Sequence, residues 1–356
     1  MQFKGERLSV SVFGQSHAPS VGMVMEGLPS GFAIDSERLS AFMARRAPGQ
    51  GSFTTARKEA DALEFLSGLT GNKSCGAPIC AVIRNSDTRS RDYSRFLSVP
   101  RPSHADYPAR VKFGPSFDIR GGGQFSARLT APLCAAGGIA LQWLEAQGVA
   151  VGAHIAAIAG IRDAAFDPVN VSAADFEAVQ KNGFPVLDAA SGAQMLTAIE
   201  EARQAQDSVG GIVECAAVGL PVGLGDALFG GLESALSAAL FAIPAVKGVA
   251  FGSGFQASDM RGSQHNDAYV LRDGRVATAT NHAGGILGGM TTGMPLIFQA
   301  AFKPTPSIGQ PQRSVNLDTM EETELIITGR HDPCVVPRAV PVVEAVTALV
   351  LMDKML

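Results

Sequence analysis

The chain has 356 residues, of which 46% are hydrophobic and 17% charged, with 40 glycines and 20 prolines. This composition is typical of a turn-rich globular protein and excludes a disordered chain. The net charge is −4, but residues 41–130 hold 14 lysines and arginines against 7 aspartates and glutamates. A local basic excess in an acidic chain predicts an anionic ligand. Nucleic acid is the weaker candidate, because the segment has few stacking aromatics and no reader motif.

The five cysteines are scattered and lack CxxC spacing. This argues against a disulfide scaffold or a zinc site, predicts no metal, and indicates a reducing compartment, the cytoplasm. The first residues, MQFKGERLSV, lack the apolar core of a signal peptide. The apolar stretch 335–351 is broken by Pro337, Arg338, Pro341 and Glu344, so it predicts a buried helix and not a membrane span.

In chain order, Leu8, Val10 and Val12 alternate with polar residues and predict a strand, which turns and returns as a second strand at 22–26. Ser36 is expected to cap a helix that ends with Arg45 and Arg46 in its last turn, before Pro48-Gly49. Short strands are then expected at 63–66 and 79–83, and a core helix at 129–144. Later elements are expected as a strand at 149–161, helices within 172–205, and strands at 296–300 and 325–327.

A short motif occurs twice. Gly27-Leu28-Pro29-Ser30-Gly31 recurs as Gly219-Leu220-Pro221-Val222-Gly223, and each copy follows a predicted strand and precedes an amphipathic helix. This context predicts a duplicated βαβ-like unit. We therefore expect one α+β domain over 1–356, with two pseudo-equivalent halves at approximately 1–150 and 205–356.

The most informative segment runs from Arg101 to Arg128 and contains RPSHADY and RGGGQFSAR. Three consecutive glycines let a ligand lie against bare backbone, and arginines bind phosphate and carboxylate oxygens bidentately. His104 beside them supplies an imidazole, the side-chain type suited to act as an acid or a base. The segment predicts a pocket for a multiply charged anion with an acid or base next to it. The alternative is a glycine turn on a solvated basic face.

A later group again combines glycine runs with cations and hydroxyls: TNHAGGILGG (280–289), Lys303-Pro304-Thr305-Pro306-Ser307 and GRHDPC (329–334). It suits a second anionic ligand such as a nucleotide phosphate, although neither a Walker A loop nor a Rossmann fingerprint is present.

Each candidate residue has a structural alternative. A buried hydrogen-bonding role is favoured for His154 and is left open for His265, His282 and His331, whereas turn positions beside glycine or arginine favour function for His17 and His104. Asp332 precedes a proline, so a cap or turn role competes with a chemical one. Arg45 and Arg46 have the alternative of a pair that complements the helix dipole.

Taken together, these segments resemble chorismate synthase nearly from end to end. The resemblance rests on Gln15-Ser16-His17, ARRAPGQ (44–50), TARKEAD (55–61), RPSHADY, RGGG, DSVGGIVE (207–214), IPAVKGVAFG (243–252), RGSQHND (261–267), TNHAGGILGG, AFKPTPSI (301–308) and GRHDPCVVPRAVPVVEA (329–345).

The resemblance implies a β-α-β sandwich with two pseudo-symmetric halves, assembled as a homotetramer. It also implies a lyase of the shikimate pathway, in aromatic amino acid biosynthesis. This enzyme converts 5-enolpyruvylshikimate-3-phosphate to chorismate by 1,4-anti elimination of phosphate and needs reduced FMN. The charged substrate would account for the basic segment, and the FMN phosphate for the later one.

The resemblance also implies roles for individual residues. His104 would protonate the leaving phosphate, His17 would protonate reduced flavin, and Asp332 would assist proton transfer at the flavin, with Ser16 and Ser126 in support. Substrate contacts would fall on Arg46, with Arg45, Arg120 and Arg128. FMN contacts would fall on Gln124, Phe125, Ser126, Ala245, Gly288, Lys303, Pro304, Thr305, Pro306, Ser307 and Arg330.

The sequence departs from the commoner family pattern at Gln15, Ala18, Ser52, Ser103, Gln124 and Phe125. Gln124 and Phe125 stand where arginine and serine are usual, and Ser52 stands where an arginine is usual. The retained histidines, Arg46, Lys303 and Asp332 favour an active branch variant. The competing hypothesis is a non-catalytic paralogue that binds flavin or substrate without turnover. Because Ser52 removes a cation associated with NADPH, we expect an external flavin reductase rather than reduction by NADPH.

Overall fold

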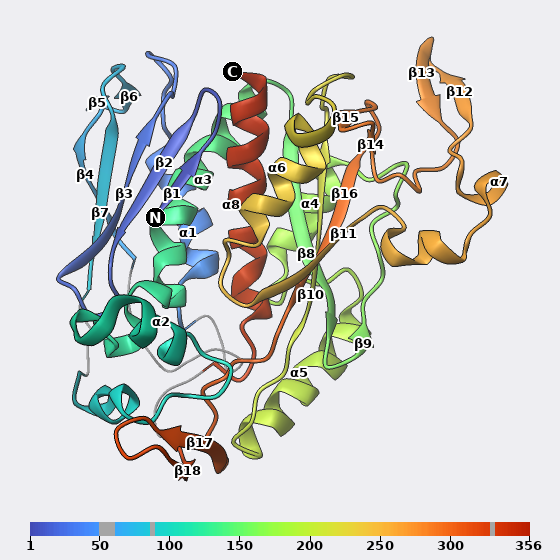
Figure 1. Ribbon diagram of the computed structural model, residues 1–356. Coiled ribbons are helices and arrows are strands. Elements are labelled where there is room, and N and C mark those ends of the chain that lie inside the picture. The colour runs from blue at the N-terminus through green and yellow to red at the C-terminus, as the bar shows by residue number, and fades with distance from the viewer. Residues whose placement is uncertain (50–60, 86–89, 328–331) are drawn as a thin grey trace.

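The computed structural model describes residues 1–49, 61–85, 90–327 and 332–356. In this part of the chain, two five-stranded sheets enclose a layer of helices (Figure 1). Neighbouring strands in both sheets run antiparallel. The predicted α+β class is confirmed.

The N-terminal sheet has the order β1-β2-β3-β7-β4. Its strands include all those predicted in the first 85 residues, at β1 (Gln2–Lys4), β2 (Ser9–Gly14), β3 (Ser20–Glu26), β4 (Leu63–Ser67) and β7 (Ile79–Arg84). The C-terminal sheet has the order β11-β16-β10-β8-β9. Its strands are β8 (Ala150–Ile158), β9 (Ile161–Arg162), β10 (Gly211–Val218), β11 (Val246–Phe251) and β16 (Leu296–Phe302).

Four two-stranded ribbons complete the β-structure. They pair β5 (Leu69–Thr70) with β6 (Lys73–Ser74), β12 (Tyr269–Arg272) with β13 (Arg275–Thr278), β14 (Ile286–Leu287) with β15 (Met290–Thr291), and β17 (Gln312–Asn316) with β18 (Glu321–Leu325). The strand expected at 325–327 is therefore wrong beyond Leu325, because β18 ends where its pairing with β17 ends.

Four helices lie between the sheets: α1 (Ser36–Arg46), α3 (Thr130–Ala146), α6 (Leu232–Leu240) and α8 (Val336–Met355) (Figure 1). The others are α2 (Asp106–Phe113), α4 (Ala173–Lys181), α5 (Ala189–Gln204) and α7 (Gly262–His265). The expected helical cap at Ser36 is wrong: Ser36 is the first helical residue. The Asp35 carboxylate instead accepts from the amides of Glu37 and Arg38, both at 3.0 Å.

The predicted C-terminal helix is confirmed as α8, which is buried along most of its length and packs against α3 in the core. Near its end, the buried Asp353 carboxylate accepts hydrogen bonds from the amides of Glu6, Arg7 and Leu8, at 3.0, 2.8 and 2.8 Å. These bonds join the first strands to the last helix. No helix among the described residues is long and apolar enough to cross a membrane.

The two copies of the glycine motif occupy equivalent places. β3, α1 and β4 form a split βαβ unit in which β7 pairs with both strands, and β10, α6 and β11 do the same around β16. The Ser74 hydroxyl accepts from Phe32 N at 3.0 Å and donates to Pro29 O at 2.6 Å. The Thr291 hydroxyl accepts from Leu224 N at 2.9 Å and donates to Pro221 O at 2.5 Å. The two motifs thus make matched contacts, and a duplicated unit stays a prediction.

The motif gives a test with an internal control. Gly219 and Gly223 both have left-handed backbones, with φ of +83° and +87°. A Cβ at Gly219 would lie 2.2 Å from Gly148 O, whereas one at Gly223 would meet nothing within 4 Å. We expect Gly223→Ala to cost about 1–2 kcal/mol of unfolding free energy from backbone strain alone. Gly219→Ala should cost at least about 1–3 kcal/mol more, because the backbone at Gly148, just before β8, must also move. Urea unfolding of both variants measures this difference, and equal losses would contradict it.

Candidate active site

A cavity of about 1180 Å³ lies between the halves and is lined by segments of both. It brings together twelve of the residues that the sequence assigned to chemistry or binding. They are Arg46, His104, Gln124, Phe125, Ser126, Arg128, Ala245, Lys303, Thr305, Pro306, Ser307 and Asp332.

Other predicted residues lie elsewhere or outside the described part of the chain. Ser16 and His17 are behind the glycine run and do not line the cavity, and neither do Arg45, Arg120, Gly288 and Pro304. Gly288 is exposed in the turn between β14 and β15. Arg330, His331 and Ser52 fall outside the described residues.

The three glycines all have left-handed φ values and separate the two candidate catalytic histidines. A Cβ at Gly121 would lie 2.4 Å from Ser16 Oγ and 2.8 Å from His17 Nε2. A Cβ at Gly122 would lie 3.4 Å from His104 Nε2. The run therefore lets both imidazoles approach bare backbone. That a ligand also lies against this backbone stays a prediction. Ser16 Oγ is buried and has no hydrogen-bond partner among the described residues.

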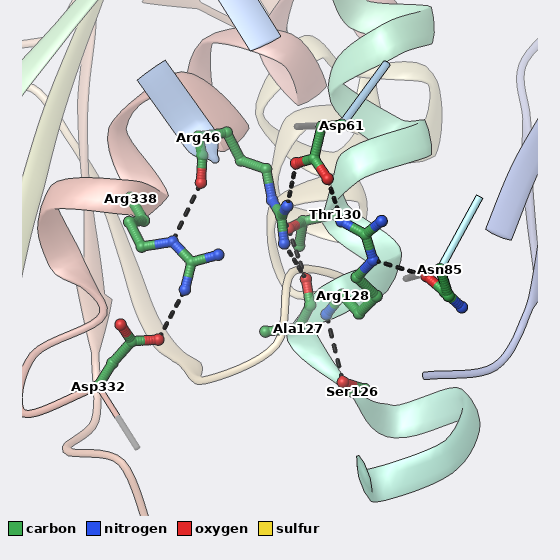
Figure 2. A network of polar contacts seen from close by, with 9 residues as sticks. All are labelled: Arg46, Asp61, Asn85, Ser126, Ala127, Arg128, Thr130, Asp332 and Arg338. Atoms are coloured by element: carbon green, nitrogen blue, oxygen red, sulfur yellow. Dashed lines mark hydrogen bonds and ion pairs between the residues drawn. The ribbon is translucent and has the colours of Figure 1, made fainter. Parts of the chain in front are cut away.

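One wall holds two buried guanidiniums around one carboxylate (Figure 2). Arg46 Nη1 donates to Asp61 Oδ2 at 2.6 Å and Arg46 Nε to Thr130 Oγ1 at 3.0 Å. Arg128 Nη1 donates to the other oxygen of Asp61, and Arg128 Nε to Asn85 Oδ1 at 3.0 Å. Burial opposes ionisation of Asp61, but the two arginines outweigh it and hold the pKa of this carboxyl below its usual 3.8. The trio keeps a net positive charge beside the cavity.

A second pair continues this wall. Arg338 Nη1 donates to Asp332 Oδ2 at 2.7 Å, and Arg338 Nε donates to the backbone carbonyl of Arg46 at 3.0 Å. Figure 2 shows Arg338 lying between Asp332 and the end of α1. Burial lowers the pKa of Arg338, and the nearby Arg46 adds to this, while Asp332 opposes it. Arg338 thus ties α8 to the arginine cluster of the other half.

His104 lies in a turn whose polar groups are nearly all engaged. Its Nδ1 is 2.6 Å from Asp106 Oδ1 and 3.1 Å from Arg101 Nη2. Arg101 binds both oxygens of the buried Asp106, through Nε at 2.7 Å and Nη2 at 2.8 Å. Burial opposes ionisation of Asp106, but hydrogen bonds from Arg101 and His104 lower its pKa.

The second predicted anion site adjoins the turn that carries His104. Lys303 Nζ donates to Ser103 O at 2.5 Å, and its amide donates to Ala245 O at 3.0 Å. Burial and the neighbouring Lys247 both lower the pKa of Lys303. The Oγ1 of Thr305 is buried without a partner among the described residues. A lysine pair beside an unsatisfied hydroxyl suits a phosphate group.

Two arginines predicted to bind substrate are already engaged away from the cavity. Arg45 binds the buried Glu344 through both terminal nitrogens, at 2.7 and 2.8 Å. Arg120 is half-exposed and binds Asp118 through Nε and Nη2, both at 2.8 Å. Substrate contact by either residue stays a prediction.

The sequence reasoning missed Asp61, Arg101, Asp106 and Arg338 as parts of the site. Arg101 and Asp106 stood inside the RPSHADY motif, and Asp61 closed TARKEAD. The available signal for Arg338 was a cation within an otherwise apolar, buried helix. By sequence pattern alone Arg338 is an interruption of that apolar stretch.

Comparison with known proteins identifies one family. The sequence model described as chorismate synthase matches residues 8–356. A protein named chorismate synthase from Lancefieldella parvula is 47% identical over 99% of this chain and 95% of its own length. One of the same name from Thermococcus gammatolerans is 46% identical over 99% of this chain and 97% of its own length. A solved structure titled as a crystal structure of chorismate synthase superposes with a TM-score of 0.78, at 25% identity, over 99% of this chain and 92% of that one.

The buried trio predicts a specific pH dependence of stability. Asp61→Asn leaves two buried guanidiniums without their counter-charge and should cost about 3–5 kcal/mol at pH 7. The folded-state pKa of Asp61 lies below the usual value of 3.8. The destabilisation by Asp61→Asn should therefore have its full size above pH 3.8. It should decrease as the pH falls from 3.8 through the folded-state pKa, because the native carboxylate then becomes protonated. Urea unfolding from pH 3 to 8 measures it. The control Glu64→Gln removes the exposed pair with Arg84 and should change stability by less than about 1 kcal/mol. A loss independent of pH would contradict the assignment.

Proposed function

Because the chain belongs to the chorismate synthase family, we propose that this cavity is where it carries out the family's reaction. The chain is a carbon–oxygen lyase of the shikimate pathway. It converts 5-enolpyruvylshikimate-3-phosphate to chorismate and phosphate, a step of aromatic amino acid biosynthesis. The observation that carries the proposed site is a histidine beside bare glycine backbone, facing a cavity lined by guanidiniums.

The substrate, with one phosphate and two carboxylates, matches the charge of the wall. Arg46, Arg101, Arg128 and Arg338 line the cavity, and the carboxylates that hold Arg46, Arg101 and Arg128 are themselves buried behind it. Fixed cations at a site shielded from water stabilise the charge that develops on a departing phosphate. We assign Arg46 and Arg128 to substrate binding, with Arg101 and Arg338 added to the predicted set.

His104 is the acid in this proposal. Its Nε2 lies beside Gly122, and only 16% of its side chain is exposed. A proton from His104 to the phosphate oxygen, as the carbon–oxygen bond breaks, converts the dianion into a better leaving group. The arginines neutralise the remaining charge.

The residues around Lys303 fit a flavin mononucleotide. Lys303, Lys247, Thr305 and Ser307 would hold its phosphate, with Ala245, Gln124, Phe125 and Ser126 along the adjoining wall. Proteins of this family need reduced flavin, and when bound it supplies electron density that assists loss of the phosphate. The ring of Phe125 packs with those of Phe113 and Phe117, at centroid distances of 6.3 and 5.8 Å. Where serine is usual in the family, this chain therefore has a member of an aromatic cluster.

His17, Ser16 and Asp332 have supporting roles. His17 and Ser16 lie against Gly121 on the far side of the glycine run, and Asp332 lines the cavity with Arg338. We propose that these three residues donate and accept protons close to the flavin. Ser126, which lines the cavity and accepts from the amide of Arg128, would support them. Gly288, Pro304 and Arg330 remain predicted flavin contacts.

The setting of the reaction is also a proposal. The five free cysteines fit the predicted reducing cytoplasm. We further propose a homotetramer that receives reduced flavin from an external reductase, with NADPH the less favoured reductant.

The function is tested in an anaerobic assay with chemically reduced FMN and 5-enolpyruvylshikimate-3-phosphate, following chorismate and phosphate together. Equal amounts of both are expected. His104→Ala should lower kcat by about 10²–10⁴-fold with little change in KM, because it removes the acid and leaves the arginines. The control His265→Ala, on α7, should change neither constant. A raised KM with unchanged kcat would contradict the assignment of His104 as the acid. Flavin binding without phosphate release by the unsubstituted protein would favour the non-catalytic alternative.

The flavin site gives a separate prediction. Lys303→Ala removes one charged contact to a phosphate and should weaken FMN binding by about 10- to 100-fold, equivalent to roughly 1.5–3 kcal/mol. Fluorescence titration of FMN in the presence of substrate measures it. Lys181→Ala, which removes an exposed lysine on α4, is the control and should leave the affinity unchanged. An unchanged affinity in Lys303→Ala would place the phosphate elsewhere.

A further inference from the structure

The turn that carries His104 also buries a carboxylate to which the reaction so far gives no role. Asp106 is 1% exposed and begins α2, where the helix dipole favours a negative charge. It accepts from Arg101 N at 3.0 Å, from the Arg101 side chain through both oxygens, and it contacts His104 Nδ1. Asp106 does not line the cavity, so it can act only through a neighbour.

The distances decide which nitrogen of His104 carries a proton. A carboxylate only accepts hydrogen bonds, and at 2.6 Å an unprotonated Nδ1 would place its lone pair against Asp106 Oδ1. The alternative, in which Nδ1 accepts from Arg101 Nη2 at 3.1 Å, is the longer contact, and it would leave the 2.6 Å approach to Asp106 Oδ1 without a hydrogen between the two atoms. Nδ1 is therefore the donor, and its proton points into the protein.

Arg101 helps to keep the proton on Nδ1 of His104. Its guanidinium binds Asp106 as a two-pronged fork, which favours the ionised carboxylate and makes it a poor acceptor for the proton on Nδ1. The imidazole then has a single exchangeable position at the ligand side, Nε2, beside Gly122.

We propose that Asp106 is a positioning residue for His104, which it holds through Nδ1–H so that Nε2 delivers the proton in the cavity. This role rests on the proposed function, in which His104 is the acid. Arg101 takes part by sharing the carboxylate, so the two residues together set how strongly the imidazolium is stabilised.

The charged groups that face His104 come from several elements of the described chain. Arg101 and Asp106 share its turn, Lys303 reaches Ser103 O from the segment after β16, and His17 lies beyond the glycine run. Of these, Asp106 is the one anion. Its removal should therefore favour the uncharged imidazole, since Arg101 and Lys303 remain.

The first test reads the tautomer without any activity. Full-length protein labelled with ¹⁵N-histidine is studied by NMR above the pH at which the ring loses its charge, and the His104 signals are assigned from their absence in His104→Gln. We expect the proton on Nδ1 and none on Nε2. A proton on Nε2 would overturn the proposal even if the enzyme is fully active. The expected tautomer in an inactive protein would support the proposal and count against the proposed function.

The second test uses Asp106→Asn, which keeps the size and one acceptor oxygen and removes the charge. The rate at saturating substrate should begin to fall at a pH about one unit or more lower than in the unsubstituted protein. Above that pH the rate should be about tenfold lower, with a much smaller loss at low pH and little change in KM. The control Asp318→Asn removes an exposed partner of Arg110, on α2, and should leave the profile unchanged. An equal loss of rate at every pH, or a raised KM with an unchanged rate at saturation, would contradict the proposal. Asp106 would then only hold Arg101 in place. If Asp106→Asn does not fold, the tautomer of the unsubstituted protein decides alone.

Discussion

The structure depends on how like charges are kept together out of water. Among the described residues four guanidiniums line one cavity, and burial alone would drive them apart or out to solvent. Each is held by a carboxylate: Asp61 serves Arg46 and Arg128, Asp106 serves Arg101, and Asp332 serves Arg338. Because three carboxylates serve four arginines, the wall keeps a positive charge for a ligand while every cation has a fixed position. The contacts that fix the arginines in place for a ligand are therefore also the contacts that stabilise the fold around them.

These contacts also join the halves of the chain. Arg338 of α8 donates to the backbone of Arg46 at the end of α1, and Arg101 Nη1 contacts Ser307 Oγ at 3.3 Å. Lys303 likewise reaches the turn that carries His104. The proposed phosphate site of the flavin and the turn of the proposed acid are thus in direct contact, although they are about 200 residues apart in sequence.

The sequence was sufficient for most of the fold and for much of the site. Alternation and helical periodicity placed the main strands and helices, because those patterns reflect burial on one face. Local competition was harder to predict: Asp35 and Ser36 are both good caps, and only the backbone decides between them. The missing site residues share a cause. Asp61, Asp106 and Arg338 act through partners that are distant in sequence or lie within a longer motif. Arg45 is the opposite case: its charge suggests substrate binding, but its guanidinium is paired with Glu344, 299 positions away. Pairings of this kind are fixed by tertiary packing, which no local pattern reports.

The bonds from Asp353 to the amides of Glu6, Arg7 and Leu8 bear on how the protein is made. The last of these contacts spans 345 residues. At a synthesis rate of about 5–20 residues per second, the first strands wait roughly 20–70 s before α8 exists to receive them. Once α3 has been synthesised it packs against β2, β3 and β7 of the N-terminal sheet, but its own apolar surface stays uncovered until α8 packs against it. The nascent chain is therefore exposed to aggregation until α8 has been synthesised, and it depends on chaperones more than a protein whose halves close independently.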